Sequence, residues 1–195
     1  MFKIIGELTD DQLPDVETNR LLLRQRTVAD AADILNYASL PQVAYPAGFQ
    51  PMKTLGDERH YLEKIYPQRL KDQKFPSGYG ITLKGENKVI GSVDYAFRSA
   101  EDILEIGYLL HPDYWGQGIV PEAAEILLYI SFTMLNLSKL QIGCYSHNRQ
   151  SQSVAKKLGF ILESETPDIK DIQGNSCSDL KFGLLRTDWE KSQKK

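Results

Sequence analysis

The sequence predicts a mixed α/β fold, with a mostly antiparallel sheet of about seven strands flanked by about four helices. Three strand-like runs follow one another with only short turns between them, at residues 79–84, 89–97 and 103–110, which predicts an antiparallel meander. Helical patterns on both sides of the meander give the order β-α-α-β-β-β-α-β-α-β-β, which is too irregular for a doubly wound parallel sheet. The 195 residues show no shift in composition, so we expect a single domain over residues 1–195.

The first third of the chain predicts a lead-in, one strand and two helices. Residues 1–18 are expected to form an extended N-terminal lead-in to a strand over residues 20–26, which is centred on three leucines. Capping-box patterns over residues 27–30 and 54–57 predict the starts of the two helices. Pro67 should kink or interrupt the second helix, because proline lacks the backbone donor.

The part of the chain after the meander predicts a buried helix and three further strands. Apolar residues recur at helical spacing between residues 123 and 134, and this run is too short and too often interrupted by polar residues to span a membrane. We therefore expect a core helix there. The remaining expected elements are a strand over 139–145, a short helix over 151–158, strands over 160–165 and 180–185, and a flexible tail over 188–195.

Bulk properties exclude several classes of function. The formal net charge is −3 and the sequence pI is near 5.7, so no strong positive field would gather nucleic acid or an anionic membrane. The N-terminus shows no signal or transit peptide, from which we expect a cytoplasmic protein. Cys144 and Cys177, the two cysteines, have no metal-ligand or CxxC spacing, so we expect two reduced thiols and no metal site.

A glycine-rich turn lies between the meander and the core helix. Gly116 and Gly118 allow a close backbone approach to a ligand, and the following helix offers free N–H groups and a positive dipole end. This combination suits a pyrophosphate, although two glycines could also simply turn a strand into a helix. Pro121 stands where a Rossmann fingerprint needs its third glycine, and no Walker sequence is present.

Two separated blocks of sequence carry a resemblance to a known family. The first contains Glu105-Ile106-Gly107-Tyr108, His111-Pro112-Asp113-Tyr114-Trp115-Gly116-Gln117-Gly118 and Glu122-Ala123; the second contains Asn148-Arg149-Gln150-Ser151 and Lys157-Leu158-Gly159-Phe160. In order and spacing they resemble the RimJ/RimL-type branch of the GNAT superfamily of N-acetyltransferases. The resemblance covers roughly residues 17–187, and it implies the GNAT fold.

The resemblance implies an acetyl-CoA-dependent enzyme with no metal. A primary amine would attack the thioester directly in a ternary complex, with no covalent enzyme intermediate. Val120 departs from the usual glycine or alanine, and its branched side chain could weaken cofactor contact. The residues that the resemblance assigns to acetyl-CoA are Leu109, Leu110, Trp115, Gly116, Gln117, Gly118, Ile119, Val120, Asn148 and Ser151.

Two residues are candidates for the proton transfers. Glu105 is the candidate general base, because the strand that carries it ends near the thioester in this family; alternatively it is a solvated strand charge. Ser151 matches the position that protonates or hydrogen-bonds the departing sulfur, and it could instead serve only the first turn of its helix, with Asn148 as the N-cap. Many members carry a tyrosine where this sequence has Ala155, and Tyr145 is a reserve acid.

The acceptor is less constrained than the cofactor. Acceptor contacts are expected from residues 45–49, from the helix after Thr54 and from a loop over 166–178, whose Asp168 and Asp171 could attract a cationic amine. The branch favours the N-terminal amine of a ribosomal or other protein, and the same scaffold also serves small amines, polyamines and antibiotics. Alternatives from other classes are a non-catalytic acyl-CoA sensor and an unrelated nucleotide-binding protein. We expect a monomer or a homodimer.

Overall fold

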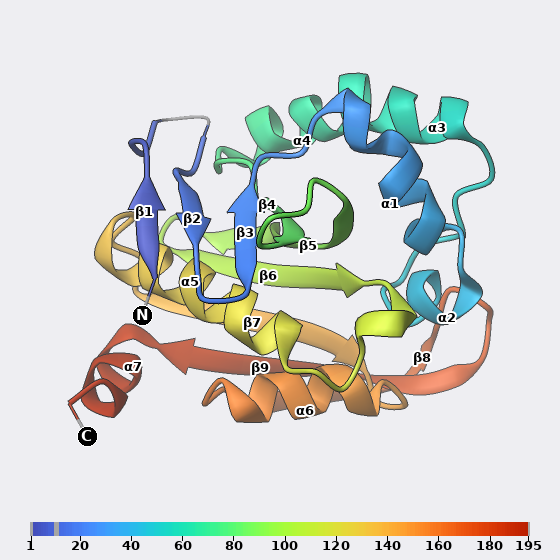
Figure 1. The fold of residues 1–195 in the computed structure, drawn as a ribbon. Helices are drawn as coiled ribbons and strands as arrows, with labels where there is room; N and C mark the ends of the chain where they lie inside the picture. The colour runs from blue at the N-terminus through green and yellow to red at the C-terminus, as the bar shows by residue number, and fades with distance from the viewer. Residues whose placement is uncertain (1, 10–11, 195) are drawn as a thin grey trace.

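The computed structural model describes residues 2–9 and 12–194, so Met1, Asp10 and Asp11 of the predicted lead-in and Lys195 of the predicted tail lie outside it. The described strands form one sheet in the order β1-β2-β3-β4-β5-β6-β7-β9-β8 (Figure 1). Neighbouring strands are antiparallel except β6 and β7, which are parallel. The strands are β1 (Lys3–Ile5), β2 (Asp15–Glu17), β3 (Leu21–Arg24), β4 (Tyr79–Leu83), β5 (Val89–Ala100), β6 (Ile103–Leu110), β7 (Lys139–Tyr145), β8 (Ile161–Lys170) and β9 (Ser176–Leu185).

Helices cover both faces of this sheet. One face packs against α5 and α6, and the other carries α1, α3 and α4, with α2 at its edge (Figure 1). The prediction of a mostly antiparallel sheet flanked by helices is therefore confirmed. The helices are α1 (Ala31–Ala38), α2 (Pro41–Ala44), α3 (Leu55–His60), α4 (Tyr66–Gln73), α5 (Ile119–Thr133), α6 (Arg149–Lys157) and α7 (Arg186–Ser192), with 3₁₀ turns at Val28–Asp30 and Pro112–Tyr114.

The core lies between the sheet and α5. Side chains that alternate along β5 and β6 point to this face, as a pleated strand requires, and they meet the buried side of α5. The buried hydroxyls of Tyr95 on β5 and Ser131 on α5 form a hydrogen bond of 2.8 Å, so the polar groups of this core are paired. A smaller apolar cluster fills the space between β5 and the α1–α3 side.

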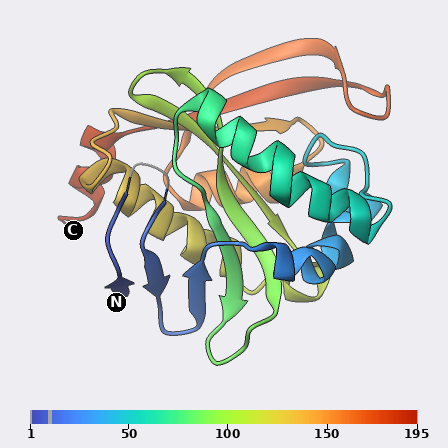
Figure 2. The ribbon, with the colours of Figure 1, turned by 90° about the horizontal axis from the view of Figure 1, so that it is seen from above.

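The helix that contains Pro67 runs without a break from Leu55 to Gln73. Its capping box is present: the Thr54 hydroxyl accepts from the Asp57 amide at 3.1 Å, and the Asp57 carboxylate accepts from the Thr54 amide at 3.0 Å. A single π-helical turn, Tyr61–Ile65, precedes the proline, and a wider turn of this kind accommodates a residue that lacks a backbone donor. Figure 2 shows the run as one long helix lying over the central strands.

Both ends of the chain hold more regular structure than the sequence pattern predicts. The lead-in contributes β1 and β2 to the sheet edge, which brings the described sheet to nine strands. The predicted tail is helical through Ser192, and Trp189 packs against Phe132 of α5 at a ring separation of 5.3 Å. The predicted loop over 166–178 is mostly part of the long β8–β9 hairpin, with only residues 171–175 between the strands. None of the described helices is long and apolar enough to cross a membrane.

Candidate active site

The parallel strands β6 and β7 separate partway along their length. They are paired only at Ile103 with Lys139, Leu104 with Leu140, and Glu105 with Gln141. Beyond that point β6 stays with β5, whereas β7 stays paired with β9 along its full length. A V-shaped gap therefore opens between the two strands, and strand edges that face it keep free backbone groups.

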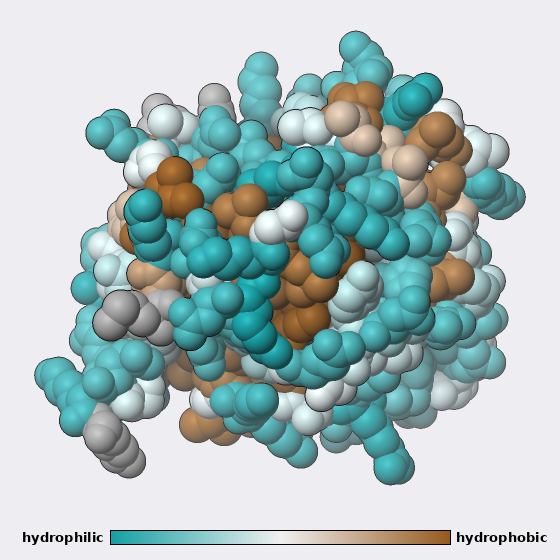
Figure 3. Space-filling view, in the orientation of Figure 1, coloured by the Kyte–Doolittle hydropathy of each residue, from teal (hydrophilic) through white to brown (hydrophobic). Residues whose placement is uncertain are grey.

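A cavity of about 1050 Å³ occupies this gap and extends beneath α1 and α3. In the orientation of Figure 1, hydrophobic side chains gather in the middle of the face and hydrophilic ones surround them (Figure 3). Every residue predicted to contact the cofactor lines the cavity except Gln117. The Gln117 side chain instead donates to the Asp113 carbonyl at 3.0 Å and is exposed, so its direction differs from the prediction.

The glycine turn has the backbone conformation that the sequence predicted. Gly116 and Gly118 have φ of 74° and 73°, values that favour glycine because a Cβ would be strained there. Gly118 is the N-cap of α5, and the first-turn amides of this helix are thus available to a ligand. Nothing lies within 4 Å of a Cβ built on Gly116, which leaves open space over the turn.

Two cationic side chains that the sequence reasoning did not assign lie beside this turn. A Cβ built on Gly118 would be 3.7 Å from the Lys157 Nζ and 3.9 Å from an Arg20 Nη. Arg20 is held in place by Glu122 and by the Gln117 carbonyl. The only sequence signal that Lys157 belongs to the site is its place in the second sequence block. Its position beside Gly118 could not be predicted, because the approach of α6 to the turn before α5 is a tertiary contact.

Val120 does not spread its branched side chain over the turn. It is 8% exposed and belongs to the core beneath the first turn of α5. Ile119, at 3% exposure, is buried in the same way. The departure from the family's glycine or alanine therefore alters the floor of the cavity and leaves the backbone surface of the turn clear.

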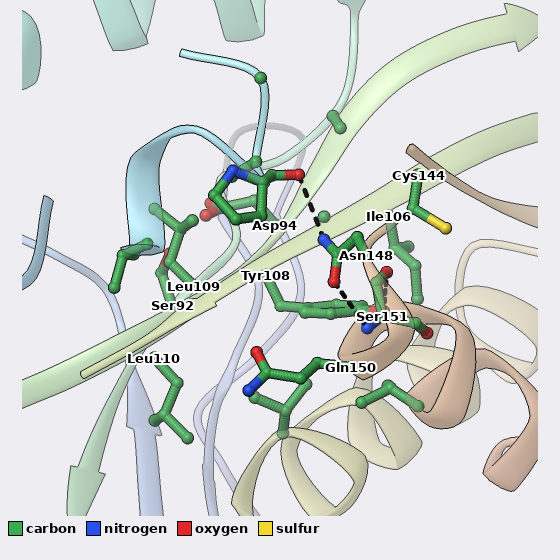
Figure 4. A pocket seen from close by; sticks show the side chains of 18 of the residues that line it. Ser92, Asp94, Ile106, Tyr108, Leu109, Leu110, Cys144, Asn148, Gln150 and Ser151 are labelled. Carbon is green, nitrogen blue, oxygen red and sulfur yellow. Dashed lines mark hydrogen bonds between the residues drawn. The ribbon is translucent and has the colours of Figure 1, made fainter. Parts of the chain in front are cut away.

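The start of α6 forms the opposite wall. Asn148 is its N-cap, since the side-chain oxygen accepts from the Ser151 amide at 3.0 Å. The Asn148 side-chain nitrogen donates to the Pro46 carbonyl at 3.2 Å, so the same residue ties α6 to the segment after α2 (Figure 4). The expected capping role of Asn148 is confirmed.

A tyrosine reaches Ser151 from an unexpected element. The hydroxyls of Tyr108 on β6 and Ser151 on α6 are 2.8 Å apart across the gap (Figure 4). Burial raises the pKa of Tyr108 above its usual value, so its phenol stays protonated and can donate. The sequence quoted Tyr108 within a motif, but which element it would face depends on the separation of β6 and β7. The reserve acid Tyr145 also lines the cavity and stacks on His147.

Glu105 stands at the closed end of the gap, at the last pair between β6 and β7. Its carboxylate accepts from the Lys181 ammonium at 2.5 Å, and both side chains are partly buried. Leu110 ends β6, five residues further on. The candidate base therefore lines the cavity, but with its charge already engaged.

The predicted acceptor segments divide between the cavity and the surface. Residues 46–49, after α2, line the cavity. Asp171 is turned into its own hairpin loop, where it accepts from the Gln173 and Asn175 amides, and Asp168 is exposed on β8. Neither aspartate lines the cavity, and their attraction of a cationic amine stays a prediction.

A buried charged cluster that the sequence did not reveal lines the part of the cavity beneath α1 and α3. The Arg26 guanidinium pairs with Asp94 on β5 and lies 4.5 Å from the Tyr66 ring centre. The Tyr66 hydroxyl donates to the same Asp94 carboxylate at 2.9 Å. Glu58 on α3 is 2% exposed, and burial raises its pKa to about 7. These residues come from the segment after β3, from β5 and from α3 and α4, and their separate positions in the sequence gave no sign of this assembly.

A known family matches most of the chain. The profile described as "Acetyltransferase (GNAT) domain" matches residues 20–161. The chain belongs to the GNAT acetyltransferase family. Among its relatives, the uncharacterized N-acetyltransferase p20 of Bacillus licheniformis is 28% identical over 173 residues, which cover 88% of this chain and 96% of that protein. This GNAT protein is thus an N-acetyltransferase, a class whose members use acetyl-CoA, and the sensor and nucleotide-binding alternatives are not supported.

Solved structures place the chain in the GNAT fold. The ribosomal-protein-S5-alanine acetyltransferase of Vibrio fischeri superposes with a TM-score of 0.72 at 22% identity, covering 90% of this chain and 98% of that one. The spermidine N-acetyltransferase of Vibrio cholerae, in complex with CoA and spermine, gives a TM-score of 0.72 at 20% identity, covering 89% and 99%. At these identities the likeness concerns the fold, and the two proteins have different acceptors.

Proposed function

We propose that this GNAT enzyme uses acetyl-CoA as its acetyl donor and acetylates the N-terminal amine of a protein, as the RimJ/RimL-type branch does. The observation that carries the donor assignment is the gap between β6 and β7 with the glycine turn of α5 at its mouth. An elongated thioester could lie along the free edge of β6 while its anionic end meets the turn.

The residues around the turn fit the anionic part of CoA. The amides at the start of α5 supply donors, and the open space over Gly116 admits a phosphate. Arg20 and Lys157 add positive charge beside Gly118, which favours a pyrophosphate over a neutral ligand. The His111 amide donates to Ile90 on β5; by the alternation of a strand, the Leu110 amide then points to the opposite edge, toward the gap.

The residues of α6 and β6 fit the chemistry at the sulfur. Acetyl-CoA supplies an acyl group whose bond to sulfur breaks as the bond to the amine nitrogen forms. The paired hydroxyls of Tyr108 and Ser151 can donate a hydrogen bond to the departing sulfur, and a proton can pass along them. Because both are poor acids near neutral pH, we assign them to stabilising and relaying rather than to holding a free proton.

The choice of acceptor rests on the energy of deprotonation and on the relatives. An α-amine needs about 1.4 kcal/mol to lose its proton at pH 7, against about 4.6 kcal/mol for a lysine-like amine. A protein N-terminus can therefore be deprotonated by a weaker base than a lysine-like amine requires. The putative ribosomal N-acetyltransferase YdaF of Bacillus subtilis, 29% identical over 135 residues, supports this choice by its name.

A polyamine is the second candidate acceptor. The spermidine N(1)-acetyltransferase of Escherichia coli is 34% identical, although over only 107 residues, or 53% of this chain. The four carboxylates along the cavity, Glu58, Asp94, Glu105 and Asp179, could receive a polycation. Against this, Arg26 and Lys181 already balance two of them.

The test is an assay of acetyl transfer from acetyl-CoA, in which the release of free thiol is measured. Peptides that begin with serine or alanine, the same peptides with blocked N-termini, and spermidine form the acceptor panel. We expect turnover with the free peptides only. Turnover with spermidine alone would show that the acceptor is a polyamine and not a protein N-terminus. The absence of both turnover and a CoA-induced thermal shift would refute the assignment of acetyl-CoA as the donor as well. Lys157→Ala should weaken CoA binding, and more so at low salt.

A further inference from the structure

Glu58 is the cavity's one carboxylate that is buried and, within the described residues, without a partner. Asp94 is held by Arg26 and Tyr66, and Glu105 is held by Lys181. Asp179 is only partly buried. Glu58 is 2% exposed, and among residues 2–9 and 12–194 its carboxylate makes no hydrogen bond or ion pair.

A buried, unpaired carboxylate is costly for a fold. Removing it from water disfavours its charge, and the charge of Arg26, which is already paired with Asp94, offsets only part of that cost. A glutamine would fit the same space without the penalty. A group of this kind, kept in a cavity beside a reaction site, is the pattern of an acid–base residue rather than of a structural one.

Glu58 and the end of β6 line the same cavity. Ser92 is the register partner of Leu109, and both line the cavity with Glu58. Tyr37 also lines the cavity and is fully buried, and its hydroxyl makes no hydrogen bond of good geometry to any described residue. Figure 4 shows Ser92 and Asp94 side by side along β5, next to Leu109.

We propose that Glu58, and not Glu105, is the general base that takes the proton from the acceptor's ammonium group. This rests on the proposed transfer of an acetyl group to an amine. Glu58 accepts one proton, directly or across one water, and leaves a neutral amine. The amine nitrogen bonds to the thioester carbon and the carbon–sulfur bond breaks. The second proton of the nitrogen passes to the sulfur, and Glu58 releases its own proton to solvent.

The surroundings of Glu58 are consistent with a base that works near neutral pH. The charge of Glu58 is coupled to Arg26, Tyr37 and Tyr61, and Asp94 and Tyr66 both contact Arg26. Burial raises the pKa of all three tyrosines above the usual value, so none of them titrates near pH 7. The positive charge of Arg26 opposes the effect of burial on Glu58 without cancelling it.

The test is the pH profile of kcat/KM with acetyl-CoA and a serine-starting peptide, for wild type, Glu58→Gln, Glu105→Gln and Glu63→Gln. Glu63 is an exposed glutamate on the same helical run, so its variant removes an equal charge from outside the cavity. We expect Glu58→Gln to lower kcat by about 100-fold or more. The acidic limb should move from about pH 7 to the pKa of the peptide's own amine, about 8.

Wild type and Glu63→Gln should keep the limb near pH 7. A CoA-induced thermal shift equal to that of wild type shows that Glu58→Gln is folded and binds its donor. A Glu58→Gln limb that stays in place overturns the assignment, as does a limb that moves in Glu105→Gln instead. A wild type that acetylates no amine overturns the proposed function and this inference together, whereas an active wild type with an unmoved limb overturns the inference alone.

Discussion

Replacing Glu58 by glutamine should stabilise the fold above neutral pH while it lowers kcat. The pKa of Glu58 is about 7 in the folded chain, against 4.5 for an exposed glutamate. The folded state thus holds a proton that the unfolded state has released between these two values. The stability that this group contributes is fully present below pH 4.5 and is lost as the pH rises through 7.

The size of the effect follows from that difference. One pKa unit corresponds to 1.36 kcal/mol, so wild type should lose about 2 to 3 kcal/mol of unfolding free energy from Glu58 between pH 5 and pH 8. Glu58→Gln lacks this loss. The free energy of unfolding of the variant, relative to wild type, should therefore rise by the same amount over this interval.

Urea unfolding at several pH values between 5 and 8 measures the difference directly. Glu63→Gln is the control. Because Glu63 is exposed, the unfolding free energy of this variant should differ from that of wild type by an amount that does not depend on pH. Parallel curves for wild type and Glu58→Gln would refute the reasoning, since they would mean that Glu58 is ionised at no cost in the folded chain. A variant that is both more stable and inactive would mark Glu58 as a residue kept for its chemistry.

Three further predictions test other parts of the protein. Ser151→Ala should lower kcat by about 100-fold with little change in CoA affinity, as measured by thiol release and titration calorimetry; an equal loss in affinity would make Ser151 a binding residue. Gly118→Ala and Gly85→Ala should each cost about 1 kcal/mol of stability because both glycines have positive φ, whereas only Gly118→Ala should reduce the CoA-induced thermal shift. Arg26→Met should destabilise the fold by about 3 to 5 kcal/mol in urea unfolding, because it leaves Asp94 buried without its cation; a loss below about 1 kcal/mol would contradict that account.

The sequence pattern predicted the elements that are stabilised by interactions between residues close in the sequence. The capping box at residues 54–57 forms as its spacing predicts, and the Gly116–Gly118 turn has the backbone conformation that only glycine adopts easily. The meander is also predictable, because each hairpin joins strands that are neighbours in sequence. Strands β1 and β2 were missed because three-residue segments gain their stability from the sheet edge and not from their own pattern.

Residues that act together in the site come from distant parts of the chain, and their sequence patterns do not say which will meet. Tyr108 reaches Ser151 because β7 follows β9 away from β6. Lys157 lies beside Gly118 because α6 and α5 pack on the same face of the sheet. Neither contact has a local signal.

By itself the sequence determined the family, the order of the central elements and the glycine turn before α5, since these follow from short motifs and the preferences of neighbouring residues. Only the tertiary structure decided which carboxylate is free to act as a base. Glu58 and Glu105 are both glutamates in regular elements, and their sequences do not distinguish them. Packing buries one without an ion pair and brings Lys181 to the other. Basicity depends on removal from water and on the approach of a charge, and both are set by residues distant in the sequence.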